Sequence, residues 1–152
     1  MKAINVMTFK VATIAADAQI ETAHTLMLRL GVRHLPVISN GKLVGILSDR
    51  DVLLCAGKTE DGFVYPPSLV AQSMSVDCVT AQLHTPIADL AKLMLAHKID
   101  AVPIVLGDKE LLGLVTSTDL LRVVGVLPGC LSMRCHLLET GQSGGPECTV
   151  TP

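Results

Sequence analysis

Hydrophobic positions along the chain alternate between two periods, which predict helices separated by paired strands. From Ile20 to Leu30 the apolar residues recur every three or four positions, as on one face of an amphipathic helix. In the stretch "RHLPVISNGKLVGILS", two apolar runs flank Asn40-Gly41, the dipeptide most typical of a two-residue hairpin turn. A second helix is predicted after Ser48. The pattern therefore predicts a short extended segment, helix, strand, turn, strand and helix.

The same pattern occurs a second time in the chain. A shift of 67 positions places Met7 on Met74, and after one extra residue a shift of 68 places Gly45 on Gly113. "TPIADLAKLMLAHKI" repeats the first helix, and "DAVPIVLGDKELLGLVT" repeats the hairpin with a longer turn. Each of the two matched glycines leaves room for a ligand or another backbone to approach closely. We infer an internal repeat of one structural unit.

The repeat divides the chain into four segments. The first repeat covers residues 1–57 and the second covers residues 69–127. Residues 58–68 form a polar linker that contains glycine and proline. Residues 128–152 leave the pattern and are rich in glycine, serine and proline, so we expect a weakly ordered C-terminal tail.

Composition excludes several classes of function. The 152 residues are 49% hydrophobic but only 2% aromatic, and their formal net charge is -2. We expect no nucleic-acid binding, because the chain lacks both aromatic stacking platforms and a basic cluster. No apolar run is long enough to span a membrane, and no signal peptide is visible. Five irregularly spaced cysteines predict a reducing, cytoplasmic location.

A hydroxyl residue and an aspartate lie three positions apart at the predicted start of the last helix in each repeat. The pairs are Ser48 with Asp51 and Thr116 with Asp119. A capping box, which only stabilises the helix start, accounts for this spacing. The same corner can also bind a nucleotide, because the hydroxyl can donate to a phosphate and the aspartate can accept from a ribose diol. The two interpretations are compatible.

The tandem "RHLPVISNGKLVGILSDRDV" and "DAVPIVLGDKELLGLVTSTDL", each preceded by "MT" or "MS" and an amphipathic helix, resembles the cystathionine-β-synthase (CBS) domain pair, or Bateman module. The resemblance covers residues 7–124. It implies an α/β (α+β) fold in which two β-α-β-β-α repeats pack with pseudo-two-fold symmetry around two clefts. It also implies an adenosine-containing ligand, which in this family is AMP, ADP, ATP, S-adenosylmethionine or NAD.

The resemblance places most of the expected ligand contacts in the first cleft. Asp51 matches the aspartate that binds ribose, and Ser48 matches the hydroxyl beside it. The positions that often meet phosphates are Arg33, His34 and Arg50. The positions expected on the adenine side, from the other repeat, are Thr80, Asp100 and Ala101.

The second cleft is expected to bind more weakly. Its matching residues are Thr13, Thr116 and Asp119, but Thr118 stands where the first repeat has Arg50. The counterparts of Arg33 and His34 are Asp100 and Ala101. Because these replacements remove the cations, we expect this cleft to take an uncharged adenosyl group or nothing.

The expected function is regulatory, because no catalytic motif appears in the sequence. We expect a stand-alone, non-enzymatic module that senses an adenosyl ligand, requires no cofactor and acts on an unidentified protein. A symmetric homodimer is expected through residues 26–30 and 93–97. Cys130, Cys135 and His136 match no standard zinc spacing, so no metal site is expected. The alternative is a ligand-free dimerisation or scaffold module in which the repeated corners only cap helices.

Overall fold

The computed structural model describes residues 1–60 and 62–125, and both predicted repeats have the expected order of elements. The elements of the first repeat are β2 (Ile14–Ala15), α1 (Ile20–Leu30), β3 (His34–Ser39), β4 (Lys42–Ser48) and α2 (Asp49–Cys55). Those of the second are β8 (Ala81–Gln82), α4 (Ile87–His97), β9 (Ala101–Leu106), β10 (Glu110–Thr116) and α5 (Ser117–Gly125). The prediction of two β-α-β-β-α repeats in a mixed α/β fold is confirmed.

The hairpin of the first repeat has the predicted two-residue turn. Asn40 and Gly41 join β3 to β4 with φ angles of 50° and 77°. Positive φ at both turn residues is the requirement of a type I′ turn, whose twist matches that of the flanking strands. The Asn-Gly turn sets the register as far as the pair Ile38 and Leu43, beyond which a bulge shifts it by one residue.

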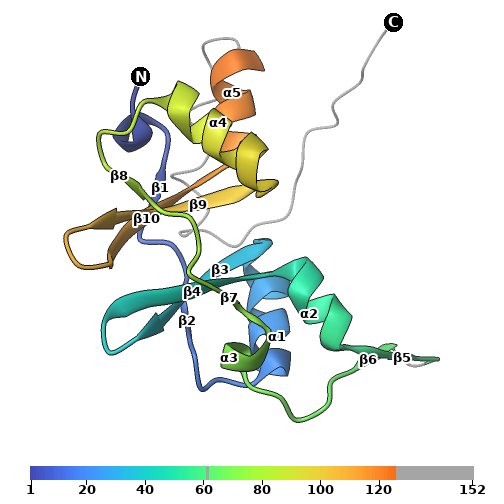
Figure 1. Cartoon of the computed structure of the whole chain (residues 1–152). Helices are drawn as coiled ribbons and strands as arrows, with labels where there is room; N and C mark the ends of the chain where they lie inside the picture. The colour runs from blue at the N-terminus through green and yellow to red at the C-terminus, as the bar shows by residue number, and fades with distance from the viewer. Residues whose placement is uncertain (61, 126–152) are drawn as a thin grey trace, which may run out of the picture.

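Each repeat builds its own four-stranded sheet, and the two sheets lie one above the other in Figure 1. The strand orders are β2-β3-β4-β7 and β1-β10-β9-β8. The outermost strands on one side, β7 (Ser75–Val76) and β1 (Thr8–Phe9), come from the segment that leads into the opposite repeat. The two repeats therefore exchange their leading strands.

The exchange extends into the two hydrophobic cores. The 3-10 helix η1 (Ala3–Asn5) places Ala3 in the core of the second repeat, beside Leu90. The short helix α3 (Val70–Ser73) places Val70 in the core of the first repeat. Backbone hydrogen bonds from Ala3 N to Thr85 O and from Val70 N to Ala18 O, both 2.8 Å, fix these crossings.

The repeated glycines lie where the exchanged segments cross the sheets. A Cβ atom on Gly113 would lie 2.5 Å from the carbonyl oxygen of Thr8, and one on Gly45 would lie 2.7 Å from that of Ser75. Both distances are far shorter than an ordinary contact. The sequence left open whether a ligand or a backbone approaches these glycines, and the structure places a backbone there.

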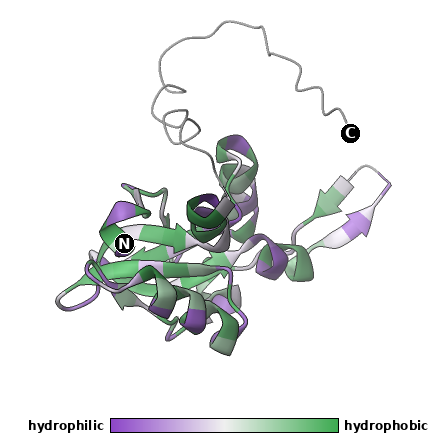
Figure 2. Ribbon diagram, turned by 90° about the horizontal axis from the view of Figure 1, so that it is seen from above, coloured by the Kyte–Doolittle hydropathy of each residue, from purple (hydrophilic) through white to green (hydrophobic). Residues whose placement is uncertain are grey.

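The predicted linker contains a β-hairpin. Strands β5 (Gly57–Thr59) and β6 (Gly62–Val64) pair in antiparallel fashion and extend away from the two sheets (Figure 2). The hydroxyl of Tyr65 lies 2.7 Å from Nδ1 of His24 and connects the base of this hairpin to α1.

Two expectations concern residues that the structure does not describe. The weakly ordered tail at residues 128–152 and the group Cys130, Cys135 and His136 lie outside the described part of the chain. Within residues 1–60 and 62–125, no helix has the length and apolar character needed to cross a membrane.

Candidate functional site

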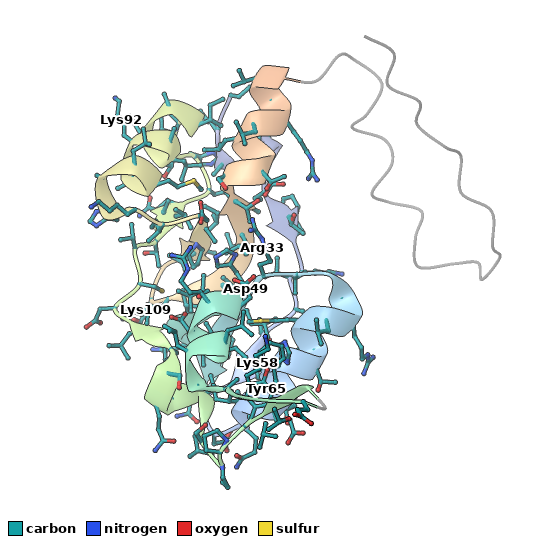
Figure 3. All side chains as sticks on the ribbon, turned by 90° about the vertical axis from the view of Figure 1, so that its right-hand side faces the viewer. Arg33, Asp49, Lys58, Tyr65, Lys92 and Lys109 are labelled. Carbon is teal, nitrogen blue, oxygen red and sulfur yellow. The ribbon has the colours of Figure 1, made fainter. Side chains whose placement is uncertain are left out.

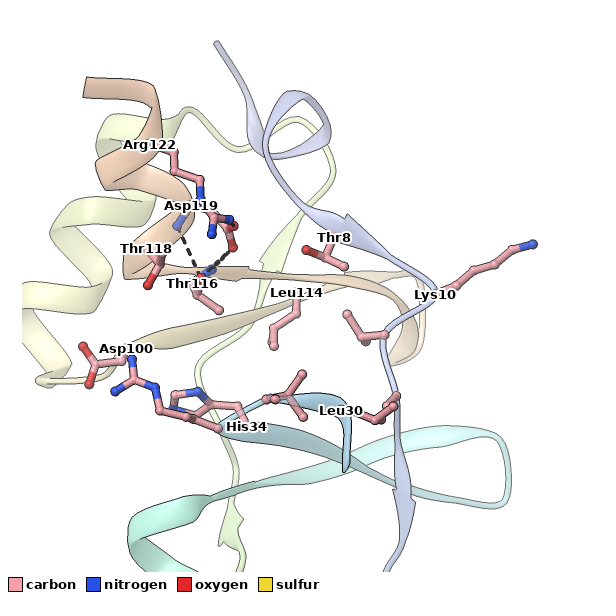
Figure 4. Close-up of a pocket in the computed structure, with 15 residues that line it drawn as sticks. Thr8, Lys10, Leu30, His34, Asp100, Leu114, Thr116, Thr118, Asp119 and Arg122 are labelled. Carbon is pink, nitrogen blue, oxygen red and sulfur yellow. Dashed lines mark hydrogen bonds and ion pairs between the residues drawn. The ribbon is translucent and has the colours of Figure 1, made fainter. Parts of the chain in front are cut away.

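A cavity of about 560 Å³ lies between the two repeats. The first repeat contributes Thr8, Lys10, Val11, Ala12 and residues 30–34. The second repeat contributes Asp100, Leu114, Thr116, Thr118, Asp119 and Arg122. Figure 4 shows Leu30 and Leu114 on its apolar side and a row of polar groups from His34 through Asp100 to Asp119, with the Lys10 side chain pointing away.

Asp119 is the most buried charged group of this cavity, with 7% of its surface exposed. Its Oδ2 atom accepts hydrogen bonds from the backbone N–H of Thr116 at 2.9 Å and from the Thr116 hydroxyl at 2.6 Å. The Asp119 N–H in turn lies 3.3 Å from the same hydroxyl. The predicted capping box is therefore formed at the start of α5, and it holds the carboxylate at the cavity wall.

Arg122 supplies a cation to the same wall. Its Nη1 atom donates to Oδ1 of Asp119 at 3.2 Å, one turn further along α5. The side chain is half-buried, so this ion pair is screened less than a fully exposed one.

The corner of the first repeat has nearly the same geometry. The Ser48 N–H and hydroxyl donate to Oδ2 of Asp51 at 2.9 Å and 2.6 Å, and the Asp51 N–H lies 3.2 Å from the hydroxyl. Here too the capping box is formed, at the start of α2. Both repeats therefore have the cap and the carboxylate at matching positions.

Arg33 lies beside Asp49 at the level where the two halves of the molecule meet (Figure 3), and the Asp49 N–H donates to its carbonyl oxygen at 2.9 Å. His34, the next residue, also lines the cavity (Figure 4). Burial lowers the pKa of His34 below its ordinary value of 6.5, and the Arg33 charge lowers it further. The Asp49, Asp100 and Asp51 carboxylates oppose this shift. The lowered pKa favours the neutral form of His34, and charged groups of both repeats contribute to this pKa.

The cavity brings together five of the residues predicted from the sequence: Arg33, His34, Asp100, Thr116 and Asp119. The other predicted residues of the first cleft do not line it, and they are Ser48, Arg50, Asp51, Thr80 and Ala101. Thr13 lines a separate hollow of about 230 Å³ beside Gly41 and Glu110. The first cleft around Asp51 remains a prediction.

The expectation that the cleft of Asp119 lacks cations was wrong. Arg33 and Arg122 both line the cavity that contains Asp119, as does the imidazole of His34. The second repeat has no counterparts of the first repeat's cations, but Arg33 and His34 of the first repeat themselves line the cavity of Asp119. Arg122 was not predicted because the first repeat has Leu54 at that position. The signal was present, since an arginine three residues after an aspartate on a helix is placed to pair with it.

The described residues contain no group of three or more histidine, cysteine, aspartate or glutamate side chains placed to hold a metal ion. Cys55 and Cys78, the two described cysteines, are both free thiols. The polar groups of the cavity are two carboxylates, three hydroxyls, an imidazole and cationic side chains. This donor set suits an organic ligand with hydroxyls and a negative charge.

The family model of the CBS domain matches the chain twice, over residues 2–57 and 70–126. The chain is 34% identical over 115 residues to CBS domain-containing protein YhcV of Bacillus subtilis, covering 75% of this chain and 79% of that protein. It is also 37% identical over 122 residues to a homoserine O-acetyltransferase of Methanococcoides burtonii. That match covers 80% of this chain but only 24% of the enzyme.

Solved structures of CBS domain pairs share the fold. The CBS domain pair of protein MJ0100, in complex with 5′-methylthioadenosine and S-adenosyl-L-methionine, superposes with a TM-score of 0.70 at 25% identity. The match covers 82% of this chain and 96% of that chain. CBSX2 in complex with AMP gives a TM-score of 0.70 at 24% identity, covering 81% of this chain and 95% of the other.

Proposed function

The chain belongs to the CBS domain family, and on that premise we propose that it is a regulatory CBS pair that binds an adenosine-containing ligand between its repeats. The main support for this proposal is the composition of the cavity. Its lining contains the nearly buried carboxylate of Asp119, hydroxyl groups, and the cations Arg33 and Arg122. A ribose hydroxyl can donate to the carboxylate, and a phosphate or carboxylate of the ligand can accept from the cations. The MJ0100 domain pair, similar in fold, was solved with two such adenosyl ligands.

Ligand binding would act by coupling the repeats. The cavity wall combines residues 30–34 of the first repeat with α5 of the second, so a bound ligand contacts both halves at once. A ligand can shift the angle between the repeats only if it binds one arrangement better than another. The proposed output is a change in an unidentified partner protein that contacts both halves.

The first cleft is a second proposed site. Asp51 and Ser48 keep the geometry of Asp119 and Thr116, and Arg50 lies next to Asp51 at the start of α2. We propose that Thr80, Asp100 and Ala101 face the adenine there, as the family resemblance implies. A phosphate-bearing nucleotide is the proposed ligand of this cleft.

Assembly as a homodimer is also proposed. The ends of α1 and α4 expose large apolar side chains, with Leu28 at 70% and Leu95 at 80% of their surfaces. Exposed leucines on both repeats support an apolar contact with a second copy through residues 26–30 and 93–97. The chain spans about a quarter of the length of the M. burtonii enzyme, and we propose no catalytic activity for it.

The second candidate function is a ligand-free scaffold. It is favoured by the two capping boxes, because each aspartate already has a structural role at a helix start. Under this alternative the adenosyl family of ligands would bind to neither cleft, and the chain would serve only to assemble subunits.

Calorimetric titration with AMP, ATP, adenosine and S-adenosylmethionine separates the two candidates. We expect at least one of them to bind, and Asp119→Ala or Asp51→Ala to weaken it by about 10- to 100-fold, since a hydrogen bond to a charged group contributes about 1.5–3 kcal/mol. Each variant is titrated well below its own melting temperature, because losing a cap costs about 1 kcal/mol of stability. Absence of heat with every ligand would support the scaffold.

A further inference from the structure

The two clefts differ in how many acceptor positions their aspartates have left. An ionised carboxylate offers about four lone-pair positions on two oxygens. In both Asp51 and Asp119, the Oδ2 atom already accepts two hydrogen bonds from the capping residue, one from its N–H and one from its hydroxyl. A ligand therefore has to use Oδ1.

At Asp119 one position on Oδ1 is already taken. Nη1 of Arg122 donates to it at 3.2 Å (Figure 4). In the first repeat the matching residue is Leu54, which is 80% exposed and has no donor group. No donor among residues 1–60 and 62–125 forms a hydrogen bond with Oδ1 of Asp51. Asp51 has two open positions and Asp119 has one.

A vicinal ribose diol carries two hydroxyls and needs two acceptor positions to donate both protons to one carboxylate. We propose that Arg122 determines how the second cleft recognises a ribose: with Arg122 in place, Asp119 binds a single hydroxyl, whereas Asp51 can bind both. This inference rests on the proposed adenosyl-binding function. It predicts that the second cleft accepts sugars lacking one hydroxyl nearly as well as ribose, and that the first cleft does not.

The position of Arg122 favours an ion pair with Asp119 that persists when a ligand binds. The carboxylate is nearly buried, so losing the guanidinium would leave a poorly solvated charge with one oxygen unpaired. The two residues lie three positions apart on α5, so the helix itself keeps them together. A ligand that displaced Arg122 would have to compensate for that loss.

The test compares AMP with 2′-deoxy-AMP by calorimetry in chains where only one cleft can bind. In an Asp51→Ala chain, which leaves the second cleft, we expect the two affinities to differ by less than about fivefold. Adding Arg122→Leu, which copies the residue of the first repeat, should raise the preference for AMP to about 10- to 100-fold, the effect of one hydrogen bond to a charged group. In an Asp119→Ala chain the first cleft should show that preference, and adding Leu54→Arg should reduce it.

Two controls keep the result interpretable. Lys92→Leu removes another pair of this spacing, Lys92 with Asp89 at 3.1 Å on α4, and neither residue lines the cavity. It should leave the preference unchanged, and a change equal to that of Arg122→Leu would overturn the inference. If Arg122→Leu unfolds the protein, Arg122→Met replaces it, because methionine also lacks a donor and its unbranched side chain adapts better to the space of the arginine stem.

The remaining outcomes are distinct. An equal preference for AMP with and without Arg122 overturns the inference, whether that preference is large or small. Binding to the unsubstituted chain with none to the Asp51→Ala chain overturns it too, although the proposed function then survives through the first cleft. If neither nucleotide nor any other adenosyl ligand binds the unsubstituted chain, the proposed function fails and this inference fails with it.

Discussion

Replacing Gly113 by alanine tests the exchange of leading strands directly. The new Cβ atom would lie 2.5 Å from the carbonyl oxygen of Thr8, whereas ordinary contact begins near 3.4 Å. Strand β1 would have to move by about 0.9 Å, the difference between these two distances. Because the closest atom belongs to the backbone, no side-chain rotation relieves the clash.

The magnitude follows from the cost of overpacking. Forcing an extra methyl group into a packed site costs about 1–3 kcal/mol, and the loss of glycine flexibility in the unfolded chain offsets about 0.4–1 kcal/mol. The middle of these two ranges leaves a net decrease of about 1–2 kcal/mol in the free energy of unfolding of Gly113→Ala. For a chain of this size that lowers Tm by roughly 2–8 °C. The cavity should change as well, because Thr8 and the residues that follow it line the wall.

The assay is urea unfolding of the variant beside two matched glycine replacements. Gly45→Ala should also destabilise, since its Cβ would lie 2.7 Å from the Ser75 carbonyl oxygen. Gly57→Ala is the control, because its Cβ would meet nothing closer than 3.6 Å and its backbone is extended. If Gly113→Ala proved as stable as Gly57→Ala, strand β1 would not cross β10 at this glycine, and the exchange would be refuted.

The pKa of His34 lies below 6.5 in the folded protein, so the unfolded chain takes up a proton first as the pH falls. Stability should therefore decrease between about pH 7 and 5.5 more steeply in the unsubstituted chain than in His34→Gln, and equal slopes in chemical denaturation would contradict this. At the other corner, Thr116→Ala removes the hydroxyl that accepts from the Asp119 N–H and should cost about 1 kcal/mol of unfolding free energy, whereas Thr116→Ser should restore it. Equal urea midpoints for the two Thr116 variants would show that the cap contributes nothing.

The sequence predicted the elements whose signals are local. The helical stripes appear as α1 and α4, and the Asn40-Gly41 turn joins β3 to β4 as expected. The two capping boxes form at the predicted pairs of residues, because their spacing of three is set by the helix itself.

No local sequence pattern predicted that β1 and β7 pair with the sheet of the opposite repeat. Strands β1 and β7 have two residues each, too few to show a hydrophobic period. Gly45 and Gly113 indicated that another group approaches the backbone closely, but not that this group is the backbone of an exchanged strand. The hairpin in the linker was missed for a related reason, since strands β5 and β6 have three residues each and show no buried face.

Only part of the candidate site could be predicted, because an internal repeat predicts residues that have a counterpart in the other half. Asp119 and Thr116 have such counterparts in Asp51 and Ser48. Arg122 has none, and the place of Arg33 and His34 in the cavity wall depends on how the repeats pack.

The exchanged leading segments also bear on how the chain can be divided. A protease cut in the hairpin at residues 57–64 would separate the sequence repeats but leave two fragments that still depend on each other. The N-terminal fragment would carry Ala3 and strand β1, which complete the second core and sheet, and the C-terminal fragment would carry Val70 and strand β7, which complete the first. Fragments made this way should reassemble by complementation, whereas either one alone would lack an edge strand and part of its hydrophobic interior.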